Sequence, residues 1–207
     1  MSVLLFGKGL LLGLAIAAPV GPIGALCISR TLTRGFWAGV AGGLGTALAD
    51  AAYAMLAAVG FAAFAAALSA IATPLGLVGG LFMIWLGWRG LAPKPVATAA
   101  EIDARDLIHT TTATFFLTIA NPTTILSFAA IFAGLGLSTV GQGIKGAIVV
   151  SGVFLGSLAW WFFLSGGVAL AKRRLPDSFA AWVSRISGLL LIAFGITALA
   201  SSATRFV

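Results

Sequence analysis

Asp50 is the single acidic residue of this sequence that falls inside a long apolar stretch. A carboxylate at the centre of a membrane helix costs about 2.5–3.5 kcal/mol to insert, so its presence there indicates a role in moving an ion or a substrate. Thr46 and Tyr53 lie one helical turn before and after Asp50, on the same face of the helix. This polar face is suited to hold an ammonium group or a proton. The alternatives are structural: a carboxyl group hydrogen-bonded to a neighbouring helix, and a tyrosine hydroxyl bonded to nearby backbone.

Two interruptions that contain proline form the second candidate feature. Pro19 and Pro22 remove two backbone donors from the first apolar stretch, so a straight helix cannot pass through them. Asn121-Pro122 interrupts the corresponding stretch of the second half, and paired interruptions of this kind mark the binding sites of secondary transporters. The helix that begins at each interruption presents free N–H groups and a positive dipole end, which suit a carboxylate. A structural role, in which the polar residues only satisfy the broken backbone, stays open.

The elements that must position these residues are membrane helices. Of the 207 residues, 60% are hydrophobic and 8% are charged, whereas a soluble domain carries about 25% charged residues. The apolar stretches reach the roughly 20 residues that are needed to cross a bilayer. The sequence therefore predicts an all-α integral membrane protein with six transmembrane helices, of which the first and fourth are broken at proline. The predicted spans are 3–28, 35–66, 75–91, 110–133, 142–171 and 179–203.

The predicted helices divide into two repeats of three, residues 1–91 and 110–207, joined by a polar cytoplasmic linker at 92–109. Because three is odd, the second repeat enters the membrane from the opposite side, which defines an inverted repeat within one membrane domain. The repeat aligns Pro22 with Pro122, Gly45 with Gly152, Gly80 with Gly188, Gly87 with Gly195, Asp50 with Ser157 and Tyr53 with Trp160. The candidate substrate-binding and coupling residues are therefore Thr46, Asp50, Tyr53, Pro19, Gly21, Pro22, Asn121, Pro122, Thr123, Thr124, Ser157 and Trp160.

The net charge of +7 follows the predicted topology. Nine basic residues lie in or beside alternate loops, and Lys8, Lys145 and Arg205 lie on the other side. This positive-inside bias predicts that both termini lie outside the cytoplasm, and it gives no reason to expect nucleic-acid binding. The nine basic residues are Arg30, Arg34, Arg89, Lys94, Arg105, Lys172, Arg173, Arg174 and Arg185.

Cys27 is the only cysteine, which excludes an internal disulfide.

Several short motifs, taken in order, resemble the lysine exporter (LysE/RhtB) family over essentially the whole chain. They are Ala18-Pro19-Val20-Gly21-Pro22, Ile28-Ser29-Arg30-Thr31-Leu32, Arg34-Gly35, Gly45 with Asp50, and Asn121-Pro122 after an aromatic run. The resemblance implies export of amino acids and related small molecules across the bacterial inner membrane, driven by the proton gradient. It carries over Gly21, Pro22, Asp50, Asn121 and Pro122 as pattern positions. Ile23-Gly24 and Thr123-Thr124 depart from the family pattern, in which many members have polar or basic residues.

The leading prediction is a secondary-active exporter of a cationic or neutral amino acid that uses no cofactor. A single intramembrane acid, with all Lys and Arg assigned in or beside the loops, favours a cationic or zwitterionic solute over a dicarboxylate. The alternative is export of a divalent metal ion or another small metabolite, although one Asp supplies few of the oxygen ligands that such an ion needs. An enzyme would need a nucleophile–base pair or a His beside Asp50, and the predicted spans offer neither. The expected partners are the lipid bilayer and a small solute, and homo-oligomer formation stays open.

Overall fold

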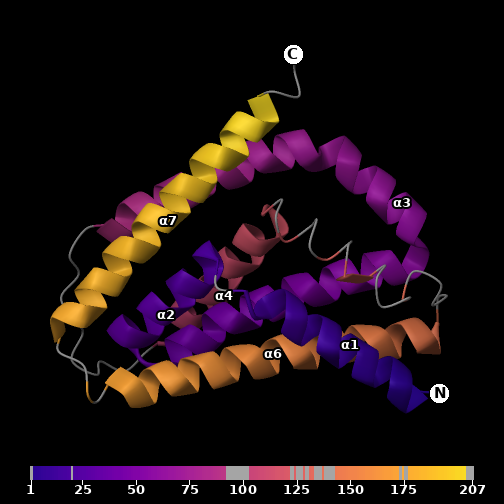
Figure 1. Ribbon diagram of the computed structural model, residues 1–207, viewed down its shortest axis with the longest axis horizontal. Coiled ribbons are helices and arrows are strands. Elements are labelled where there is room, and N and C mark those ends of the chain that lie inside the picture. Colours follow the sequence, from indigo (N-terminus) through magenta and orange to yellow (C-terminus); the bar gives the residue numbers. More distant parts are fainter. Residues whose placement is uncertain are drawn as a thin grey trace.

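The computed structural model is helical throughout its main elements (Figure 1). The helices are α1 (Ser2–Ala17), α2 (Pro22–Arg34), α3 (Phe36–Leu91), α4 (Ala104–Ile119), α6 (Ile144–Lys172) and α7 (Asp177–Ala203). The structure describes residues 2–19, 21–91, 103–121, 124, 128, 131, 132, 137, 143–172, 174 and 177–203, with 60–72, 177, 180 and 203 described by their backbone alone. No strand occurs among these residues, in agreement with the predicted all-α class.

The first predicted helix is divided at its prolines, and the two parts, α1 and α2, meet at an angle of 80°. Gly21 is the N-cap of α2, and Pro22 lies in its first turn, where a helix does not need the missing N–H. The helix continues to Arg34, beyond the predicted end at residue 28, because no helix-breaking residue precedes Gly35. Gly35 has a φ of 93°, a left-handed conformation that favours glycine, and it separates α2 from α3.

The second and third predicted helices, 35–66 and 75–91, form one continuous helix in the structure. This helix, α3, contains Pro74 without a break. The structure differs from the prediction because the intervening segment is rich in alanine, the best helix former, and one proline removes only one backbone donor. Figure 1 shows that α3 bends back on itself, so that both of its ends lie at the same end of the molecule.

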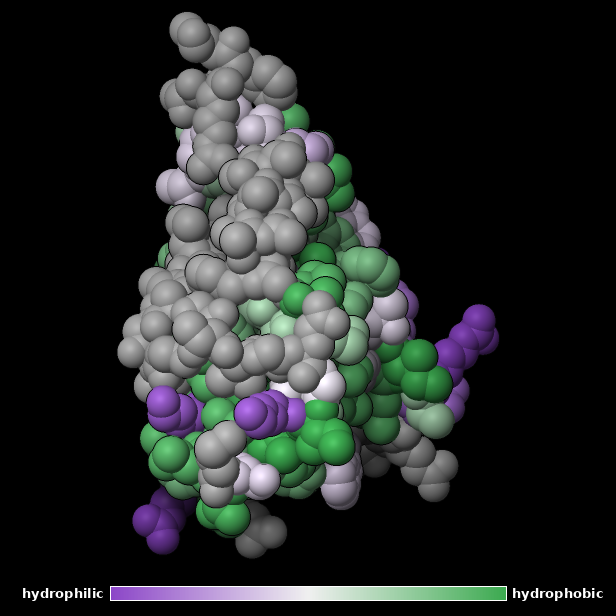
Figure 2. Space-filling model, turned by 90° about the vertical axis from the view of Figure 1, so that its right-hand side faces the viewer, coloured by the Kyte–Doolittle hydropathy of each residue, from purple (hydrophilic) through white to green (hydrophobic). Residues whose placement is uncertain are grey.

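Four apolar helical segments are long enough to cross a membrane, and the bent pair of α1 and α2 adds a fifth if it counts as one span. The fourth predicted span, 110–133, is described only in part, because α4 ends at Ile119 and most residues from 122 to 142 lie outside the described part of the chain. Most of the coloured surface in Figure 2 is apolar, as expected for helices that face lipid. The four segments are Phe36–Val59, Thr73–Leu91, Ile144–Lys172 and Ala181–Ser202.

Helix α4 begins at Ala104, within the segment that the sequence predicts as a linker. Asp103 is its N-cap, and Asp103 Oδ1 accepts a hydrogen bond from the backbone N–H of Arg105 at 3.3 Å. The helix ends at Ile119, two residues before Asn121. The end of α4 therefore coincides with the second predicted interruption, of which Pro122 lies outside the described residues.

Close packing through glycine holds the helices together in two pairs. A Cβ atom at Gly13 of α1 would overlap the backbone of α6, and one at Gly152 of α6 would overlap the backbone of α1. Small residues of this kind let helix backbones approach each other in a membrane protein. Helices α3 and α7 pack in the same way, with glycine facing glycine. The facing pairs are Gly80 with Gly195 and Gly87 with Gly188.

Candidate functional site

Asp50 lies in the first half of α3 and has no exposed surface. Its Oδ2 accepts a hydrogen bond from Ser157 Oγ of α6 at 2.8 Å. Its Oδ1 has no hydrogen-bond partner among the described residues. A buried polar atom without a partner costs about 1–3 kcal/mol, and more when it is charged. Oδ1 is therefore the open position of this site, where a proton or the cationic group of a ligand would be stabilised.

Ser157 connects Asp50 to the first proline interruption. Ser157 is fully buried, and its backbone nitrogen lies against Gly13 of α1. Helix α1 ends at Ala17, four residues or about 6 Å further along the helix axis. The interruption between α1 and α2 therefore begins about one helical turn from the Asp50–Ser157 pair.

The residues of the first interruption differ in their surroundings. Pro22 is buried, Gly21 is half-buried and Pro19 is exposed. No side chain caps the N-terminus of α2. An uncapped helix N-terminus on the inner side of the fold has free N–H groups that suit an anionic group such as a carboxylate.

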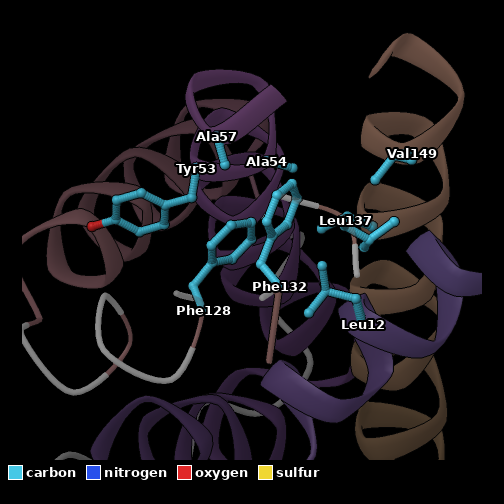
Figure 3. Close-up of a cluster of buried hydrophobic side chains, with 9 residues drawn as sticks. Leu12, Tyr53, Ala54, Ala57, Phe128, Phe132, Leu137 and Val149 are labelled. Carbon is cyan, nitrogen blue, oxygen red and sulfur yellow. The ribbon is translucent and has the colours of Figure 1, made fainter. Parts of the chain in front are cut away.

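Thr46 and Tyr53, the predicted neighbours of Asp50 on α3, are both buried and both face α4. Tyr53 lies beside Phe128 with its hydroxyl group pointing out of the apolar cluster drawn in Figure 3. This hydroxyl donates a hydrogen bond to the backbone carbonyl of Ile119 at 2.6 Å. Tyr53 therefore contacts the last turn of α4, directly before the buried Asn121.

The other predicted site residues, in the second half of the chain, form no hydrogen bond with Asp50 where the structure describes them. Thr124 is half-buried, and Pro122 and Thr123 lie outside the described residues. Trp160 packs against Phe163 on the same helix, whereas the next residue, Trp161, is buried against Gly43 of α3. Trp160 packs against the buried cluster that contains Trp161 and Met83, and Trp161 is the residue of this pair that contacts Gly43 on the helix that carries Asp50.

A row of threonines on α4 is part of the site and was missed in the sequence. Thr110, Thr114 and Thr118 are all buried, and their spacing of four residues places them on one face of the helix. Thr118 Oγ1 lies 3.4 Å from Thr46 Oγ1, one turn before Asp50. The signal was present: three threonines at a helical spacing in a mostly apolar segment, directly before Asn121-Pro122.

Arg30 joins this row at its other end. Arg30 Nη1 donates a hydrogen bond to Thr114 Oγ1 at 2.6 Å. The sequence placed Arg30 among the loop charges, but it lies within α2, which belongs to the bent candidate span. Arg30 therefore lies in the last part of a helix and not in the short turn that the sequence predicts, because α2 extends beyond its predicted end. The row connects Arg30, Thr114, Thr118 and Thr46 in this order and ends one helical turn from Asp50.

A cavity of about 600 Å³ opens where α2 and α3 end and α4 and α7 begin. Arg30 and Thr110 belong to its lining, so the row of polar side chains leads from this cavity toward Asp50. Among the described residues, no group of three or more His, Cys, Asp or Glu side chains is arranged to hold a metal ion.

A helical membrane fold with a buried carboxyl group beside an interrupted helix has the features of a membrane transporter. The model of the LysE type translocator family matches residues 14–202, from the second half of α1 to the end of α7. The chain belongs to the LysE type translocator family, which confirms the resemblance that the motifs suggested.

Three similar proteins are named as amino acid efflux proteins or as a membrane protein. The chain is 26% identical over 195 residues to the putative amino acid efflux protein YcgF of Bacillus subtilis. This alignment covers 92% of this chain and 93% of the relative. The chain is 27% identical to the uncharacterized membrane protein YahN of Escherichia coli, over 82% and 77% of the two chains. It is 28% identical to the threonine efflux protein of Salmonella typhi, over 57% and 60%. No solved structure matches this chain.

Proposed function

We propose that this protein is a secondary-active exporter of amino acids in the bacterial inner membrane, driven by the proton gradient. Membership of the LysE type translocator family and the names of its relatives support amino acids as the solute and efflux as the direction. The observation that carries the proposal is Asp50, a fully buried carboxyl group with one oxygen that no described residue bonds. An ammonium group and a proton compete for such an oxygen, which is the chemical requirement for exchanging one against the other.

In this mechanism Asp50 alternates between two partners. When the solute is bound, its ammonium group lies against Oδ1, and its carboxylate faces the free N–H groups at the start of α2. When the solute has left outward, a proton from outside takes its place and neutralises the carboxyl group. Thr46 and Asn121 provide neutral hydrogen bonds beside this position. Outward movement of the solute is thereby linked to inward movement of a proton.

Two inverted repeats would provide alternating access to this site, and the contacts at the centre support them. Asp50 and Ser157 are aligned by the repeat and bond to each other, as expected for two residues on a pseudo-two-fold axis. Gly45 and Gly152 are also aligned. Gly45 packs on the backbone of α4 and Gly152 on the backbone of α1, which occupy corresponding places in the two repeats.

The glycines of α3 and α7 support the same symmetry. The repeat aligns Gly80 with Gly188 and Gly87 with Gly195, whereas the contacts are between Gly80 and Gly195 and between Gly87 and Gly188. A two-fold axis exchanges these two contacts with each other. Rocking of one repeat against the other around this axis would open the site to each side of the membrane in turn.

The proposal is tested by counterflow of labelled amino acids, starting with threonine, in proteoliposomes. We expect uptake for the wild type and a loss of at least about 100-fold in Asp50→Asn, because the amide has no negative charge with which to bind the ammonium group of the solute. The matched control is Asp103→Asn, which makes the same change at an exposed position where Asn is an equally good helix cap. Counterflow of no amino acid by the folded wild-type protein would refute the proposal.

A further inference from the structure

The cavity at the ends of α2 and α3 is lined by more positive than negative side chains. Its volume of about 600 Å³ is typical of small-molecule sites. Four guanidinium groups and one carboxyl group line it, and they come from α2, α3, α4 and α7. These residues are Arg30, Arg34, Arg89, Arg185 and Asp106.

The four arginines have no acidic partner among the side chains that the structure describes. Within the described part of the chain, none of them forms a salt bridge with an acidic side chain. Arg30 donates a hydrogen bond to the neutral hydroxyl group of Thr114, and Arg89 lies 4.8 Å from the centre of the Trp85 ring. Each guanidinium has five N–H donors in a fixed fork that matches a carboxylate, so several donors stay available. Like charges gathered in one cavity raise its affinity for an anion.

The rest of the lining indicates that the anion is part of a small organic molecule. Leu26, Phe82, Trp85 and Leu86 form an apolar wall from α2 and the second half of α3. Among the described lining residues, Asp106 on α4 provides the one negative charge. A zwitterion fits this arrangement, with its carboxylate toward the arginines, its ammonium group toward Asp106 and its side chain against the apolar wall.

We propose that this cavity, which we name the arginine vestibule, binds the carboxylate of the solute before the solute reaches Asp50. The inference rests on the proposed function and adds a second binding site to it. The positive-inside rule assigns this end of the molecule to the cytoplasm, where the exported solute is taken up. Arg30 belongs both to the vestibule and to the row of threonines that leads to Asp50. It is therefore the residue at which the solute passes from one site to the other.

The transport test compares exposed arginines inside and outside the vestibule. Arg34→Gln and Arg185→Gln each remove one exposed guanidinium from the lining, and Arg105→Gln removes one from α4 outside it. We expect the KM for threonine at the cytoplasmic face to rise about tenfold in the first two variants, with kcat within twofold, because a charge-assisted hydrogen bond is lost. Arg105→Gln should leave KM unchanged. Equal KM values in all three variants would overturn the proposal.

A binding test with the purified protein in detergent separates this inference from the export function. In the Asp50→Asn background, where only the vestibule remains, threonine should raise the melting temperature, and it should not do so in the triple variant Asp50→Asn/Arg34→Gln/Arg185→Gln. Threoninamide, which has no carboxylate, should stabilise neither of these variants. Stabilisation of the wild type by inorganic phosphate or phosphatidylglycerol but not by threonine would overturn the proposal, because the vestibule would then be a phosphate site. Arginine-dependent threonine binding in a protein without amino-acid counterflow would keep the vestibule and refute the exporter.

Discussion

The two carboxyl oxygens of Asp50 have different surroundings. Oδ2 is bonded to Ser157 Oγ, and Oδ1 meets no donor among the described residues. One oxygen is thus fixed by the protein and the other is left for an exchangeable partner. A carboxyl group that was only structural would be expected to have both oxygens satisfied inside the fold.

We expect Ser157→Ala to lower threonine counterflow about tenfold, because it removes a hydrogen bond to a buried carboxyl group and leaves both oxygens without a donor. The matched control on the same helix is Ser151→Ala. Ser151 is exposed, and its hydroxyl group donates to the carbonyl of Ile148 within α6. Equal counterflow rates in the two variants, at equal amounts of folded protein, would show that Ser157 does not position Asp50.

Some residues of the site could be read from the sequence, and others could not. An acid in an apolar stretch is recognisable in isolation, so the sequence predicts Asp50 as a site residue, and helical spacing adds Thr46 and Tyr53, which the structure places on the same helix as buried side chains. Arg30 was assigned to a loop because its place in the interior depends on how far α2 extends and on which helix packs against it. The threonine row on α4 is likewise recognised only from the contacts that α4 makes with α2 and α3. Each threonine alone is unremarkable in a membrane helix, where its hydroxyl group can bond its own backbone.

At the scale of helices, the contact between α1 and α6 places Ser157 beside the first interruption. This contact depends on the absence of side chains, since a Cβ at Gly152 would overlap the backbone of α1 near Phe6 and Leu10. Gly167 lies further along α6 and has no atom within 4 Å of the position of a Cβ. The two glycines therefore differ in packing while they share the same helix.

We expect Gly152→Ala to lower the melting temperature of the purified protein by several degrees and to reduce counterflow, because α1 must move away from α6. Gly167→Ala should keep or raise the melting temperature, since alanine is favoured over glycine in a helix by about 1 kcal/mol. Thermal unfolding in detergent measures both. Equal melting temperatures in the two variants would contradict the close packing of α1 on α6.

The sequence does not predict that α3 is one continuous helix, and the reason differs from that for Arg30. Hydropathy and length correctly indicated two spans, and Thr73–Leu91 starts within two residues of the predicted third helix. The alanine-rich segment before Pro74 has no residue that ends a helix. Hydropathy gives the positions of the two spans, but it does not report whether the chain between them is a loop or a bent helix.

At the scale of the whole molecule, the number of spans decides where the termini lie. Six spans place both termini on one side, whereas five place them on opposite sides. We expect both termini outside the cytoplasm, in accordance with the positive-inside bias. A cysteine at Ser2, in a background in which the buried Cys27 is replaced by serine, should react with an impermeant maleimide in spheroplasts. Alkaline phosphatase fused after Val207 should be active. Labelling of Ser2→Cys with an inactive fusion would indicate an odd number of spans.

The bend of α3 has a mechanical consequence. Arg34, joined to the start of α3 through Gly35, and Arg89, near the end of the same helix, both line the arginine vestibule. Because α3 bends back on itself, residues at both of its ends meet at one cavity, and Asp50 lies in the first half of the same helix (Figure 1). We expect an anion held between these two arginines to load the bend of the helix that carries Asp50. Binding in the vestibule and the position of the Asp50 carboxyl group would then be coupled mechanically through α3.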